Sequence, residues 1–95
     1  MCFEIIDSDD RIIVTLSGSI EVKEATSLRQ QLFPRIQNGF SGISFHLGSV
    51  TLMDSSGLGL LLAVKKIAAD FHAIVEFHDV PAPLRERLQL SGITI

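Results

Sequence analysis

The stretch from Val50 to Leu61, VTLMDSSGLGLL, decides the fold of this chain because it joins a strand-like segment to a helix-like one. An apolar pair leads into Asp54-Ser55-Ser56-Gly57, and a largely apolar segment continues to about Phe71. Asp and Ser at such a junction are favoured helix N-caps, since their side-chain oxygens accept hydrogen bonds from first-turn amides. The stretch predicts a strand, a corner capped by Asp54 or Ser55, and a helix.

The predicted helix has two faces. Its apolar side should face the core and carries Leu58, Leu60, Leu61, Val64, Ile67, Ala68 and Phe71. Steps of four, three and four from Ser55 reach Gly59, Leu62 and Lys66, which share another face. Lys66 should point to water, so we expect Leu62 to be at least partly exposed. This stripe fits docking to another protein, and equally a leucine that touches the edge of a neighbouring element.

The strands are predicted from alternating or β-branched runs between turn signals. Two close runs should form an N-terminal hairpin, with Gly18 ending its second strand. The predicted strands are Phe3–Ile6, Arg11–Leu16, the run of Ile43, Phe45 and Leu47, Ala73–Phe77, and a last short strand over Ile93–Ile95.

Two further helices flank the central corner. From Val22 to Gln37 the apolar residues step by three and four, and Pro34 should either kink the last turn or end the helix at Phe33. Later, Asp79 before Pro81 is a cap-and-first-turn pattern for a short helix containing Leu84 and Leu88, with Gly92 as its C-cap candidate.

The resulting order is β-β-α-β-α-β-α-β. Alternating helices and strands imply right-handed crossovers and a parallel central sheet, to which the hairpin adds an antiparallel edge. We therefore predict an α/β fold with a mixed, mostly parallel sheet and helices mainly on one face.

Composition limits the chain to one compact domain and excludes several classes. The 95 residues are 46% hydrophobic and 20% charged, and the formal net charge of −3 argues against a nucleic-acid module. A single cysteine, Cys2, cannot form an internal disulfide and suggests a reducing compartment. The acidic N-terminus is no secretory signal, and the run from Leu58 to Val64 is too short to insert in a membrane.

The corner itself could carry a regulatory modification. First-turn amides lack helical partners and bear partial positive charge, so a phosphoryl group on Ser55 should lie close to them. It would add about −1.5 to −2 charges, which could block a partner without unfolding the domain. Gly57 and Gly59 each cost about 1 kcal/mol relative to Ala. Capping needs neither glycine, and both would allow close approach of a backbone or ligand. Asp54 and Ser55 alone favour an ordinary cap, and it is the two glycines and the stripe on the helix that favour a functional role.

Other chemistry finds little support. Ser55 lacks the Gly-x-Ser-x-Gly frame of a hydrolase nucleophile, and there is no Gly-Lys-Ser/Thr phosphate loop. His46, His72 and His78 show no metal-ligand spacing with Cys2, and His46 is expected to be an exposed or edge histidine. We therefore expect no catalytic residues, no metal and no cofactor.

The whole pattern resembles STAS domains, the anti-sigma factor antagonist family. The central segment Val50–Leu61 resembles the family signature. Leu16–Glu21 with Ala25 and Leu28 resembles its second strand and first helix, and Val80–Leu88 with Leu90-Ser91-Gly92 resembles its third-helix segment. The resemblance implies that residues 1–95 form a single STAS-like domain. Because the chain stops at Ile95, the C-terminal helix of many relatives is expected to be absent.

The resemblance also implies a mode of action. In antagonists of this family the first Ser of the motif, here Ser55, is phosphorylated by a partner that is both anti-sigma factor and serine kinase. The unphosphorylated form binds that partner and frees the sigma factor, and a phosphatase resets the antagonist. The implied setting is the bacterial cytoplasm. The expected partner-binding residues are Asp54, Ser55, Ser56, Gly57, Gly59, Leu62 and Lys66.

A second hypothesis stays open. Ser19 stands where relatives often have an acidic residue, and His46 where they often have Asp, so partner or nucleotide contacts should differ. The alternative is a constitutive interaction module or a small-ligand or nucleotide-binding module in a stress-signalling, lipid-transport or anion-transport complex. Lipid-transport relatives tend to lack the phosphorylatable Ser, so Ser55 counts against that branch.

Overall fold

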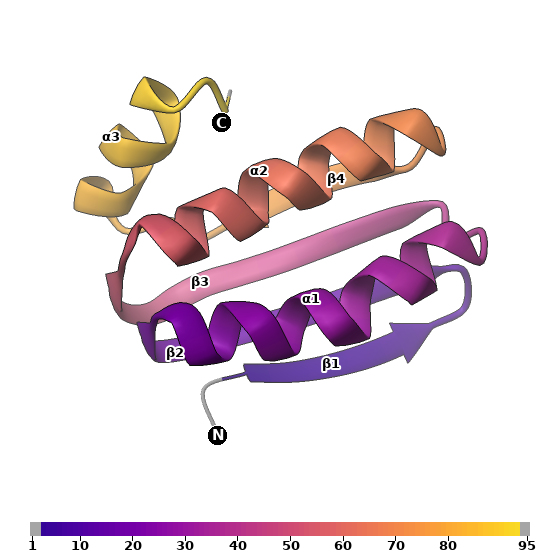
Figure 1. Cartoon of the computed structure of the whole chain (residues 1–95), viewed down its shortest axis with the longest axis horizontal. Helices are drawn as coiled ribbons and strands as arrows, with labels where there is room; N and C mark the ends of the chain where they lie inside the picture. The colour runs from indigo at the N-terminus through magenta and orange to yellow at the C-terminus, as the bar shows by residue number, and fades with distance from the viewer. Residues whose placement is uncertain (1–2, 94–95) are drawn as a thin grey trace.

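The computed structural model describes residues 3–93 and contains one four-stranded sheet and three helices (Figure 1). The elements are β1 (Phe3–Ser8), β2 (Arg11–Ile20), α1 (Val22–Gln37), β3 (Gly42–Met53), α2 (Ser55–Asp70), β4 (Ile74–His78) and α3 (Ala82–Leu90). The strand order is β1-β2-β3-β4, with β1 antiparallel to β2 and the other pairs parallel. The predicted mixed, mostly parallel sheet with an N-terminal hairpin is confirmed.

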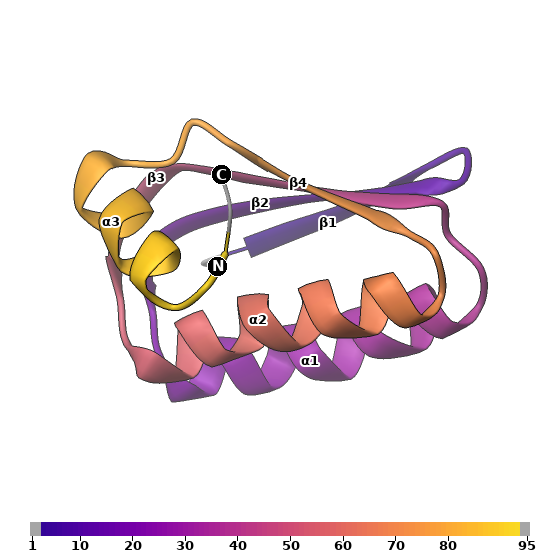
Figure 2. The same cartoon turned by 90° about the horizontal axis from the view of Figure 1, so that it is seen from above.

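Helices α1 and α2 cover one face of the sheet, and α3 lies at the end where β3 runs into α2 (Figure 2). Alternation along the two central strands explains this layering, because every second side chain points to the helices. These inward side chains are fully buried and are Ile12, Val14 and Leu16 of β2 with Ile43, Phe45 and Leu47 of β3. The expectation of helices mainly on one face is confirmed.

Strand β2 continues past Gly18, contrary to the prediction that this glycine ends it. Gly18 has a φ of 71°, and the pairing of β2 with β3 shifts register beside it, between Gly18 and Ser19. A glycine with positive φ can bend a strand at a bulge without ending it. The extension brings the fully buried Ile20 to the corner between β3 and α2.

Three other element ends bear on the predictions. Helix α1 spans the predicted range Val22–Gln37 and continues through Pro34, so of the two alternatives for Pro34 an end at Phe33 is wrong, since one proline removes only one amide donor. Strand β4 begins at Ile74 because the amide of Ala73 closes the end of α2 on Ala68 O. Pro81, and not Asp79, is the N-cap of α3.

The chain end also departs from the predicted pattern. The C-cap of α3 is Ser91, and Gly92, the predicted C-cap candidate, follows it with a φ of 95°, the left-handed conformation that a glycine after the C-cap commonly adopts. Ile93 lies outside any strand and is buried, and its amide donates to Leu88 O. The remainder of the strand predicted for Ile93–Ile95 lies outside the described residues.

Gly57 allows the start of α2 to lie directly over the end of β2. A Cβ at this buried position would stand 2.5 Å from Met53 Cγ and 3.1 Å from Ile20 O. The close approach predicted for this glycine is therefore made by the protein's own backbone. Because Gly57 is buried, its predicted direct contact with a partner is wrong, and the glycine shapes the corner from inside.

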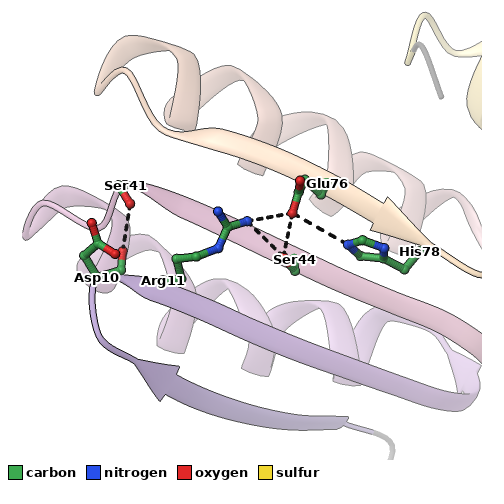
Figure 3. A network of polar contacts seen from close by, with 6 residues as sticks. All are labelled: Asp10, Arg11, Ser41, Ser44, Glu76 and His78. Carbon is green, nitrogen blue, oxygen red and sulfur yellow. Dashed lines mark hydrogen bonds and ion pairs between the residues drawn. The ribbon is translucent and has the colours of Figure 1, made fainter.

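A polar network links β2, β3 and β4 on the sheet face opposite α1 and α2 (Figure 3). Glu76 Oε1 lies 2.6 Å from Arg11 Nη2 and accepts a hydrogen bond of 3.0 Å from Ser44 Oγ. The His46 and His78 rings stack beside it with centroids 4.7 Å apart, and His78 Nε2 lies 3.6 Å from Glu76 Oε1. The Ser44 hydrogen bond and then the charge of Arg11 hold the pKa of Glu76 below its ordinary value of 4.5, against a smaller opposing effect of desolvation.

The lowered pKa of Glu76 predicts a pH-dependent contribution to stability. The charged carboxylate is favoured in the folded state, so its contribution is present above about pH 4.5 and is lost as pH falls through the lower folded-state pKa. Glu76→Gln should lower the free energy of unfolding at pH 7, and the deficit should shrink below pH 4.5. Urea denaturation across this pH range measures the deficit, with Glu86→Gln, at an exposed position of α3, as the control. A deficit that stays constant with pH would contradict the assignment.

The two helical glycines give a matched pair of substitutions. Gly57→Ala should lower the free energy of unfolding by roughly 1–3 kcal/mol, because its methyl group would overlap Met53 and Ile20. Gly59→Ala meets nothing within 4 Å and should stabilise the helix by up to about 1 kcal/mol. Thermal and urea unfolding of both variants test this, and equal effects would argue against the packing role of Gly57.

Candidate functional site

The corner before α2 is capped by Asp54, as the sequence predicts. Asp54 Oδ1 accepts hydrogen bonds from the amides of Ser56 at 2.9 Å and Gly57 at 3.1 Å. The Asp54 backbone is extended, with φ −87° and ψ −175°, and its carbonyl accepts the Leu58 amide. The cap fixes the first turn of α2 and, with it, the position of Ser55.

Ser55 is the first residue of α2 and is exposed, whereas Asp54 and Ser56 are half-buried. The sequence hypothesis requires a helix that begins here and a serine that solvent can reach, and the structure has both. A serine at this position is open to a modifying enzyme without any unfolding of the domain.

The electrostatic surroundings of Ser55 differ from the expectation in one respect. A phosphoryl group on Ser55 was expected to lie close to the first-turn amides, but two of these amides, those of Ser56 and Gly57, already donate to the Asp54 carboxylate. A phosphoryl group on Ser55 would therefore compete with a neighbouring anion for these donors. The positive end of the helix dipole still favours a phosphoryl group on Ser55, but repulsion from the adjacent Asp54 carboxylate makes the group less favourable there.

The stripe predicted on α2 lies on the surface. Gly59 and Leu62 are half-buried, and Lys66 is exposed. Leu62 also packs against the core cluster, so the predicted partial exposure is confirmed. Lys66 lies about 16 Å along the helix axis from Ser55, so the stripe extends over about three turns of α2.

Helix α1 adds a second wall beside the stripe. Ser56 and Gly59 line an open groove of about 460 Å³ together with Val22, Ala25, Thr26 and Arg29. Val22 is 62% exposed, a large fraction for an apolar side chain in a helical first turn. The sequence analysis did not include these α1 residues in the candidate site, because only helix–helix packing places them next to α2. No signal in the sequence pointed to this side, because Val22 fits the apolar spacing of α1 and its exposure appears only in the structure.

A depression between β1 and α1 lies away from this corner. This open depression of about 530 Å³ contains none of the predicted site residues, and Arg35 there pairs with Asp7. Within residues 3–93, no three His, Cys, Asp or Glu side chains are arranged to hold a metal ion. None of the helices in the described part of the chain has the length and apolar character needed to cross a membrane.

Comparison with known sequences gives a consistent result. Residues 5–95 match the protein family described as "Mlab, STAS domain". Over 63 residues the chain is 35% identical to the anti-sigma-B factor antagonist of Staphylococcus epidermidis. That alignment covers 66% of this chain and 58% of the relative, so the chain spans less than two thirds of the relative's length.

Solved structures share the fold. The anti-sigma factor antagonist SpoIIAA in its unphosphorylated form has a TM-score of 0.86 at 19% identity, over 93% of this chain and 82% of that one. The phosphorylated form of SpoIIAA, a Bacillus cell fate determinant, has a TM-score of 0.85 at 21% identity, over 95% and 83%. From the family match across residues 5–95, with the shared fold and the Asp54-capped corner, the chain belongs to the STAS domain family.

Proposed function

We propose that this domain is an anti-sigma factor antagonist whose binding to an anti-sigma factor with serine kinase activity is switched by phosphorylation of Ser55. The unphosphorylated domain binds the partner and frees the sigma factor, and a phosphatase restores this form. The observation that carries the proposal is the exposed Ser55 at the start of α2, beside the capping carboxylate of Asp54.

The docking surface that fits this role combines α2 and α1. It contains Asp54, Ser55, Ser56, Gly59, Leu62 and Lys66, with Val22 and Arg29 across the groove. Small side chains beside Ser55 let a partner backbone come close, and the exposed apolar surface of Val22 favours contact. The domain presents this surface without rearrangement, so binding requires little ordering of the chain.

Phosphorylation would change the charge of this surface sharply. In the transfer, Ser55 Oγ forms a bond to the γ-phosphorus of ATP while the bond to the bridging oxygen of ADP breaks. The hydroxyl proton passes to a base of the kinase. The product adds about −1.5 to −2 charges next to the Asp54 carboxylate, and burying this charge against a partner is costly.

The relatives support the proposal at two levels. The S. epidermidis protein that is 35% identical over 63 residues is an anti-sigma-B factor antagonist. SpoIIAA is known in both phosphorylated and unphosphorylated forms, and each superposes on this chain with nearly the same TM-score. A STAS fold of this shape therefore accommodates phosphorylation without refolding.

A constitutive binding module is the second candidate. The open groove of about 460 Å³ between α1 and α2 could hold a ligand or a partner segment with no modification of Ser55. The matching family carries the name Mlab, and a domain of this fold forms part of the SLC26A9 structure at 12% identity. Titration with GTP, ATP and phosphate would distinguish this candidate by saturable amide shifts from Gly57 to Gly59 without phosphorylation.

Phosphate incorporation gives the direct test. With the cognate kinase and ATP, wild-type protein should gain one phosphoryl group at Ser55, and Ser55→Ala should gain none. Ser55→Asp should bind the anti-sigma factor at least about tenfold more weakly than Ser55→Ala does, because the aspartate introduces charge at the interface. Mass spectrometry and calorimetry measure the two effects. Phosphate on another residue, with Ser55 unmodified, would reject the assignment.

Steric blocking tests the location of the docking surface. Gly59→Met should leave the fold intact, since nothing lies within 4 Å of the added Cβ, and should weaken partner binding at least about tenfold. Ala69→Met places the same side chain at an exposed position near the far end of α2 and is the matched control. Calorimetric titration with the partner compares the affinities of the two variants. Equal affinities would show that the docking surface does not include Gly59.

A further inference from the structure

Arg87 connects α3 to the backbone that carries the Ser55 corner. Its Nη1 donates a hydrogen bond to the carbonyl oxygen of Met53, the last residue of β3. The amide on the other side of the same peptide unit, that of Asp54, donates to Ile20 O at 3.2 Å. One peptide unit is therefore held from two directions, by α3 at its oxygen and by β2 at its nitrogen.

This peptide unit determines how Ser55 is presented. It immediately precedes Asp54, whose carboxylate then holds the amides of Ser56 and Gly57. A rotation of the Met53–Asp54 peptide plane would move the capping carboxylate and the first turn of α2 together. Since the unit is planar, fixing both its oxygen and its nitrogen removes that rotation.

The contact is separate from the packing that holds α3 in place. Leu84 and Leu88 are buried and form the apolar side of α3, whereas Arg87 is exposed. Arg85 carries the same charge on the same helix, and within residues 3–93 it makes no side-chain hydrogen bond or ion pair that reaches the corner. Helix α3 therefore offers its own matched control.

We infer that Arg87 is a positioning residue for Ser55: by holding the Met53 carbonyl it fixes the peptide plane that orients the phosphorylation corner. The inference rests on the proposed function only for the reaction that Ser55 undergoes. The positioning itself is a property of the free domain. A guanidinium suits this role because its donors lie in a fixed plane.

Amide hydrogen exchange of the free domain tests the positioning without any partner. Arg87→Ala should accelerate exchange of the Asp54 amide at least about tenfold, as expected when a charge-assisted hydrogen bond is lost nearby, with Phe45 in the centre of β3 unchanged. Arg87→Lys should recover part of the protection because lysine can still donate, and Arg85→Ala should match wild type. No acceleration in Arg87→Ala, or equal acceleration at Asp54 and Phe45, would overturn the inference.

Phosphorylation kinetics then separate positioning from binding. With the cognate kinase and ATP, Arg87→Ala should lower kcat for Ser55 while KM for the domain stays within about twofold, and Arg87→Lys should restore part of the rate. An unchanged kcat together with normal exchange at Asp54 would refute the role of Arg87. A wild-type domain that the kinase leaves unmodified at Ser55 would refute the proposed function instead, and the exchange measurement would still decide the role of Arg87.

Discussion

The structure depends on the close approach of the β2 end to the start of α2. Gly57 has no side chain, so Met53 and Ile20 can occupy the space where a Cβ would stand. This contact lets the Asp54 amide reach Ile20 O, and the Asp54 carboxylate is then in place to cap α2. The cap fixes the first turn of α2, and Ser55 is exposed at its first position.

The sequence predicted the layered fold and the capped corner well because both are local patterns. Alternation along Ile43, Phe45 and Leu47 and the Asp54-Ser55 pair needed no knowledge of the tertiary structure. The role of Gly57 was misjudged for a physical reason: a helical glycine looks the same whether its neighbour is a partner or its own chain. The Arg87 contact spans 34 residues, and a lone arginine on an exposed helix has no local signature. Gly18 shows that a glycine can continue a strand through a bulge.

The capping carboxylate affects what a phosphoryl group on Ser55 would meet. Asp54 already uses the two nearest amides, so the added dianion would remain largely in solvent and keep its charge available to repel a partner. A serine with unoccupied amides beside it would hold the group inward and hide part of that charge. The arrangement favours a modification that acts on the surface of the domain rather than on its interior.

The uncovered face of the sheet has a consequence for what can bind to it. Arg11, Ser44 and Glu76 satisfy one another across three strands, and the exposed Ile6 and Ile74 sit on strands at opposite edges. A molecule that binds this face would have to compete with these contacts between β2, β3 and β4. The face can therefore exchange polar partners only by breaking links that join the strands.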